Sequence, residues 1–147
     1  MQYAEALCVL GQRDRAATLA RPVLDQLNSK LAASPDDYRL LSSVAYAQAL
    51  VGDRTATMAT LDHMLAQVDR QPLRMENYIR ANAGIVYGWI GEKDKAMDLL
   101  VPQLKVPSAA TSSVHALRHD IDFFPLRGFP RWEAALADPA HSRPFKY

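Results

Sequence analysis

The chain has 147 residues, 49% of them hydrophobic and 22% charged, a composition typical of one soluble globular domain rather than a disordered segment. Its 17 basic and 16 acidic residues are spread along the sequence, which excludes a basic stripe of the kind that binds nucleic acid. There is no secretory signal pattern at the start and no run near the roughly 18 apolar residues of a membrane span. We therefore expect a cytoplasmic protein that binds neither nucleic acid nor membrane.

A repeat runs through the first two thirds of the chain. Gly11, Gly52 and Gly91 stand 41 and 39 residues apart, and each lies between two stretches with helical spacing of apolar residues. Glycine closes a helix at little steric cost because it adopts the left-handed conformation. A small residue follows five positions after each glycine, where it would let two helix axes approach closely: Ala16, Thr57 and Ala96. The repeat predicts three helical hairpins.

In chain order, the first helices of these hairpins are expected at 3–10, 36–51 and 74–90, each followed by a second helix after its glycine. "SPDD" at 34–37 places a proline near a helix start with carboxylates in the first turn, and Pro72 stands in a similar place. Pro22 and Pro102 recur at one offset within second helices, where we expect a tolerated bend.

The glycines, their small partners and the stretch "AGIVYGWIGEKDKAMDLL" resemble tetratricopeptide repeats. Gly84 and Tyr87 stand where that pattern has a small residue and an aromatic, whereas Thr57 replaces its usual alanine. The resemblance covers residues 1–105 and implies an all-α fold, a right-handed superhelix of three hairpins. Its first hairpin lacks the usual proline, so the second helix is expected to reach about Ala33. That hairpin also starts partway through its first helix, which predicts a piece of a longer protein with further repeats and an effector domain before Met1.

Residues 106–147 are not a further repeat but are predicted to form C-terminal capping helices and a tail. The stretch "DFFPLRGFPRW" resembles the end of tetratricopeptide regions in multidomain bacterial regulators and signalling proteins, with Phe129 where related segments commonly carry an aspartate. A stacked helical array must cover its last apolar face. The side chains expected to do so are Phe123, Phe124, Leu126 and Trp132.

The sequence carries few signals for catalysis. No phosphate loop, dinucleotide fingerprint or nucleophile elbow occurs in the sequence, so we predict no catalytic residue, no metal and no cofactor. His115 and His119 would share one helical face and could hold a metal, but the spacing positions no third ligand. Cys8 is expected to be a small packing residue rather than a reactive thiol. The cluster Glu92, Asp94 and Asp98 is interpreted as a solvated face interleaved with lysines.

The resemblance also implies a concave groove that binds a protein or peptide and is lined by the first helices. Positions carried over from it are Arg39, Ser42 and Tyr46, then Tyr78, Ala81, Ile85 and Trp89, with Glu5, Cys8, Val9 and Ala49 at neighbouring groove positions. The lysine and asparagine set that clamps a peptide carboxylate is absent from these positions. The alternative for Tyr46 and Trp89 is burial between hairpins.

Three functional hypotheses follow. The first, which we predict, is a noncatalytic protein–protein interaction scaffold, the partner-binding or sensory part of a larger bacterial regulator. The second is a structural spacer, or a self-association module that forms a homodimer through the truncated N-terminal hairpin. The third is a metal-dependent enzyme built on His115 and His119.

Overall fold

The computed structural model describes residues 1–104 and 114–141, apart from the side chains of residues 73, 74, 115 and 116. In these parts the regular structure consists of eight α-helices and three short 3-10 segments, without strands, so the predicted all-α class is confirmed. The chain divides into two compact units, Met1–Gln71 and Pro72–Tyr147, which are described separately. The predicted boundary near residue 105 lies outside the described residues.

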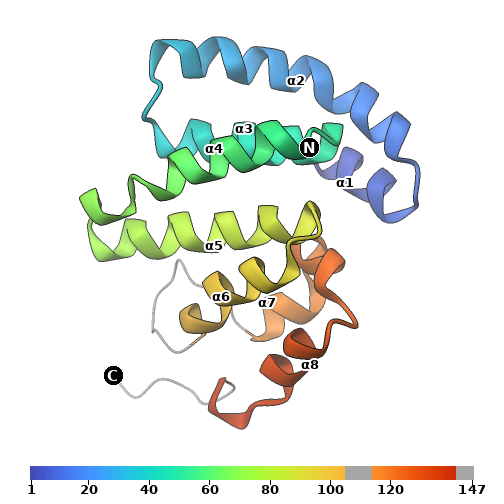
Figure 1. Ribbon diagram of the computed structural model, residues 1–147. Helices are drawn as coiled ribbons and strands as arrows, with labels where there is room; N and C mark the ends of the chain where they lie inside the picture. The colour runs from blue at the N-terminus through green and yellow to red at the C-terminus, as the bar shows by residue number, and fades with distance from the viewer. Residues whose placement is uncertain (105–113, 142–147) are drawn as a thin grey trace. The chain divides into compact units, whose positions relative to one another are not determined.

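The first unit contains two of the predicted hairpins (Figure 1). Its elements are α1 (Gln2–Val9), α2 (Arg13–Ala33), α3 (Tyr38–Val51), α4 (Arg54–Leu65) and the 3-10 segment η1 (Val68–Arg70). Consecutive helices pack against one another along the chain, α1 on α2, α2 on α3 and α3 on α4. The helix α2 contains Pro22 and continues to Ala33, as predicted.

The three repeat glycines end or follow the first helix of their hairpins in the left-handed conformation. The φ angles of Gly11, Gly52 and Gly91 are 75°, 87° and 83°. At Gly52 the turn is closed by the N–H of Asp53, which donates to the carbonyl of Gln48 at 3.0 Å. The Asp53 carboxylate then accepts the N–H of Ala56 at 2.9 Å and caps the start of α4. Each predicted hairpin turn is therefore present.

Replacing Gly52 by alanine is expected to destabilise the first unit through the backbone alone. A Cβ added at Gly52 would meet no atom within 4 Å, so the cost is that of holding an L-residue at positive φ, about 1 kcal/mol. Gly52→Asn should cost less, because asparagine tolerates this conformation. Chemical denaturation followed by circular dichroism measures both. Equal stability of Gly52→Ala and the parent chain would contradict the requirement for glycine.

The small residues of the repeat lie in the core, as their spacing predicted. Ala16, Thr57 and Ala96 are fully buried. The Thr57 hydroxyl donates to the carbonyl of Asp53 at 2.6 Å, which satisfies its polar group inside the helix packing. Ala20, Leu61 and Leu100, four positions further on, are also buried. A polar side chain thus replaces alanine at this position without leaving an unpaired group.

The second unit contains the third hairpin and the C-terminal segment. Its described elements are α5 (Leu73–Trp89), α6 (Lys93–Gln103), α7 (Val114–His119), η2 (Ile121–Leu126), α8 (Pro130–Ala137) and η3 (Pro139–His141). Within the unit, α5 packs on α6, η2 contacts α5 and α7, and α8 contacts α6 and α7. The C-terminal segment thus covers the third hairpin.

Three of the four predicted capping side chains are buried, and the fourth is not. Phe123, Leu126 and Trp132 are at most 2% exposed, whereas Phe124 is 38% exposed. The guanidinium of Arg127 lies 5.2 Å from the centre of the Phe124 ring, on the outside of the segment. The prediction for Phe124 was wrong because consecutive residues of a tight 3-10 turn point to different sides.

Asp94 and Asp98 are exposed, as expected for a solvated face, but the predictions for Pro102 and Asp37 need correction. Asp94 and Asp98 both accept hydrogen bonds from Arg131 of α8, each at 2.7 Å, so these exposed carboxylates form a link between α6 and α8. Hydrogen bonds to Asp98 and Asp94 raise the pKa of Arg131 above its usual range.

Pro102 is the last residue but one of α6, so no further turn of this helix follows it. Asp37 is the N-cap of α3 rather than part of its first turn.

Candidate partner-binding site

The predicted groove residues of the first unit lie on one face of α3. Arg39 is exposed, and Ser42 and Tyr46 are half-buried. The Arg39 Nε donates to the Tyr38 hydroxyl at 3.1 Å, which holds its guanidinium against the neighbouring aromatic ring. These three residues form a mixed polar and aromatic strip on α3.

The predicted groove residues of the second unit lie on α5 and differ in exposure. Tyr78 is 39% exposed and Ile85 is half-buried, but Ala81 and Trp89 are 6% and 8% exposed. The buried Ala81 and Trp89 offer little surface to a partner. Tyr78 is therefore the residue of this set with the most surface to offer a partner.

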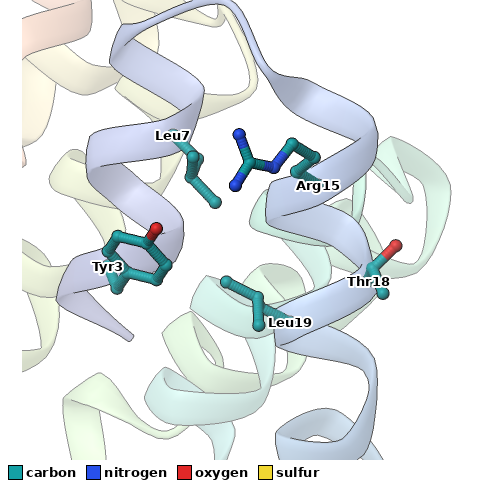
Figure 2. Close-up of a pocket in the computed structure, with 5 residues that line it drawn as sticks. All are labelled: Tyr3, Leu7, Arg15, Thr18 and Leu19. Atoms are coloured by element: carbon teal, nitrogen blue, oxygen red, sulfur yellow. The ribbon is translucent and has the colours of Figure 1, made fainter.

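Reasoning from the sequence missed a hollow between α1 and α2. It has a volume of about 220 Å³ and is lined by Tyr3 and Leu7 of α1 and by Arg15, Thr18 and Leu19 of α2. Figure 2 shows the side chains of Tyr3, Leu7, Leu19 and Arg15 directed toward the space between the two helices. Leu7 is buried, whereas Tyr3 and Leu19 are 65% and 45% exposed. The hollow thus has a buried apolar contact and uncovered apolar walls.

Most of the exposed large apolar side chains belong to this part of the chain. Among the described residues, seven large hydrophobic side chains are exposed, and five of them belong to α1, to its ends or to α2: Met1, Tyr3, Leu10, Leu19 and Val23. Tyr3 and Leu7 follow helical spacing on α1, and Leu19 and Val23 do so on α2. This second apolar stripe on α2, beside the buried Ala16 and Ala20, is the sequence signal that could have revealed the hollow.

Two residues that line the hollow, Thr18 and Arg15, make hydrogen bonds with their polar side chains. The Thr18 hydroxyl donates to the carbonyl of Asp14 at 2.9 Å and so belongs to its own helix. Arg15 donates to the side-chain oxygen of Gln12, and no carboxylate of the described residues pairs with its guanidinium. Because a guanidinium has five N–H donors, Arg15 keeps most of its hydrogen-bonding capacity for a ligand.

Cys8 lies on α1 but does not line the hollow. Partial burial raises the pKa of its thiol, the charge of Arg13 lowers it and the charge of Glu5 raises it, with burial the largest influence. A raised pKa keeps the sulfur protonated at neutral pH, so Cys8 is a poor nucleophile.

Glu5 of α1, which was also expected to face the groove, is buried rather than exposed.

The metal hypothesis finds no further support in the described parts of the chain. His119 is exposed at the end of α7, and the side chain of His115 lies outside the described residues. Across residues 1–104 and 114–141, no three histidine, cysteine, aspartate or glutamate side chains gather as metal ligands. Within the same ranges, every helix is too short or too polar to cross a bilayer.

Comparison with known proteins gives no relative from which to transfer a function. No protein-family model matches the chain, and no curated protein or solved structure is significantly similar to it.

Proposed function

We propose that this chain is a noncatalytic protein–protein interaction module of tetratricopeptide-like helical hairpins, the partner-binding or sensory part of a larger bacterial regulator. The proposal is supported by the turn glycines at positive φ and by the buried small residues five positions after them. Stacking of such hairpins in a right-handed superhelix is part of the proposal.

The observation that carries the proposal is the uncovered apolar surface of α1 and α2. Tyr3 and Leu19 remain exposed beside the buried Leu7, around a hollow of about 220 Å³. Aromatic and aliphatic side chains that surround a pocket contribute most of the binding energy at protein interfaces. Contiguous exposed apolar groups rimmed by polar residues commonly mark interaction sites. The groove strips on α3 and α5 are further candidate contacts within the same function.

The lining of the hollow suits binding better than chemistry. Three of its five residues, Tyr3, Leu7 and Leu19, supply apolar contact, and the Thr18 hydroxyl is hydrogen-bonded within α2. Arg15 carries a fixed positive charge, which can orient a ligand but cannot take up a proton at neutral pH.

Site-specific photo-crosslinking tests the proposal. A photo-crosslinking amino acid in place of Leu19 should capture a heterologous protein in the source cell, and the captured protein should bind the purified chain. The matched control is the same amino acid in place of Ser29, an exposed residue of α2 away from the hollow. Tyr3→Ser should reduce the yield at position 19 several-fold. Equal yields at both positions would contradict a partner site on this surface.

Self-association is the second candidate, because the same exposed apolar surface could contact a second copy. In that case the crosslink at position 19 would join two copies of the chain, and Leu19→Ser would abolish a concentration-dependent dimer. Sedimentation velocity over a hundredfold range of protein concentration distinguishes the two outcomes.

A further inference from the structure

The volume of the α1–α2 hollow limits what it can hold. Pockets that enclose small-molecule ligands measure roughly 300–1,000 Å³. The hollow has about 220 Å³ and is open to solvent between exposed Tyr3 and Leu19. Such a space accommodates one large side chain that projects from a partner, the usual form of an anchor residue at a protein interface.

The walls determine the chemistry of that side chain. Leu7 is 4% exposed, and the Tyr3 ring and the Leu19 side chain face each other across the opening (Figure 2). An aromatic or branched aliphatic anchor would bury these apolar surfaces together. A polar anchor would lose its hydration without gaining a partner on the Leu7 side.

Arg15 adds a requirement for negative charge. Its guanidinium extends toward Leu7 (Figure 2). Its described hydrogen bond is to the uncharged side chain of Gln12. A carboxylate is the group that matches a guanidinium fork with two parallel hydrogen bonds. The helix α2 carries four basic residues against two acids, and this excess of positive charge also attracts an anion: Arg13, Arg15, Arg21 and Lys30 against Asp14 and Asp25.

The same charges disfavour a second copy as occupant. A twofold-symmetric contact places the same surface on both sides of the interface. Two α2 helices meeting there would bring Arg13, Arg15 and Arg21 of one copy close to those of the other. Like charges brought together at an interface are repulsive.

We infer that the partner presents a short segment in which a large apolar side chain lies close to an aspartate or glutamate, an inference that rests on the proposed function. The apolar side chain fills the hollow between Tyr3, Leu7 and Leu19. The carboxylate pairs with the guanidinium of Arg15.

Selection of random 12-residue peptides displayed on phage against the immobilised 147-residue chain tests this inference. Enriched peptides should share a Trp, Phe or Leu within four residues of an Asp or Glu. For a synthetic enriched peptide, Leu19→Ser should weaken binding at least tenfold, whereas Phe124→Ser, at an exposed apolar residue that does not line the hollow, should change it less than threefold. Thermal melting by circular dichroism verifies that each variant is folded.

A double-mutant cycle tests the carboxylate specifically. Arg15→Gln should weaken the peptide about tenfold, and replacing the peptide acid by its amide should weaken it equally. The two changes together should cost no more than either alone. Arg21→Gln removes the same charge from the same helix outside the hollow and should change affinity less than threefold.

Five results would overturn the inference. Equal effects of Arg15→Gln and Arg21→Gln, or enriched peptides without an acid, would reject the carboxylate but leave the proposed interaction function. Peptide binding unaffected by Leu19→Ser would reject the hollow as the anchor site. A chain dimer abolished by Leu19→Ser would make a second copy the occupant. Failure to enrich any peptide would reject recognition of a short segment, whereas failure of the proposed function itself would appear as the absence of a crosslinked partner at position 19.

Discussion

Trp132→Ala is expected to remove about 3–5 kcal/mol from the free energy of unfolding of the second unit. Trp132 of α8 is 1% exposed, and its ring stacks on that of Phe123 with centroids 5.5 Å apart and planes at 28°. Truncation would therefore remove a large buried apolar surface and the aromatic contact that joins α8 to η2. Denaturation followed by circular dichroism gives the change, and Trp132→Phe should retain most of the stability.

Phe124→Ala is the matched control for this prediction. Phe124 belongs to the same C-terminal segment as Phe123 but is 38% exposed, so its truncation should cost less than about 1 kcal/mol. A loss below about 1 kcal/mol for Trp132→Ala would contradict the packing of α8 on the unit. Equal losses for Trp132→Ala and Phe124→Ala would do so as well.

Gly84→Ala is expected to destabilise the α5–α6 hairpin although alanine favours helices. A Cβ at Gly84 would lie 2.7 Å from Cγ of Leu100 and 3.3 Å from the carbonyl oxygen of Ala96. Overpacking of this kind costs about 1–3 kcal/mol. The gain in helix propensity offsets about 1 kcal/mol of it. We expect a net loss of up to about 2 kcal/mol in the free energy of unfolding, measured by chemical denaturation.

Gly88→Ala, one turn further along α5, is the control for the backbone effect. The nearest atoms to its added Cβ are the Cγ and Cδ2 of Leu126 at 3.4 Å, an ordinary contact, so this variant should be neutral or more stable. In a Leu100→Ala background the contact with Leu100 is removed and only the 3.3 Å approach to the carbonyl oxygen of Ala96 remains, so Gly84→Ala should cost less than in the parent chain. An equally large loss in that background would contradict the clash with Leu100.

The link between Arg131 and the two aspartates on α6 has a smaller expected role. All three side chains are largely exposed, so water and salt screen the interaction. Its geometry nevertheless fixes the direction in which α8 approaches α6, since one guanidinium contacts carboxylates one turn apart. We interpret it as a positioning contact that accompanies the apolar burial of Trp132.

The sequence was sufficient to predict the helices and their turns, because these depend on neighbouring residues. Gly11, Gly52 and Gly91 were recognised as helix ends since positive φ is a local preference of glycine. The extension of α2 to Ala33 was expected from the resemblance, because the first hairpin lacks the proline that usually ends a tetratricopeptide repeat. The same five-residue offset from each glycine predicts that the small residues are buried, as they are: Ala16, Thr57 and Ala96.

The sequence was insufficient to predict which helix faces remain uncovered. Leu19 and Trp89 both occur in apolar helical patterns, yet Leu19 is 45% exposed and Trp89 is 8% exposed. A pattern of apolar residues shows that a helix has an apolar face, but burial of that face depends on segments distant in the sequence. The hollow between α1 and α2 and the pairing of Arg131 with Asp94 and Asp98 therefore became visible only when the helices were packed together.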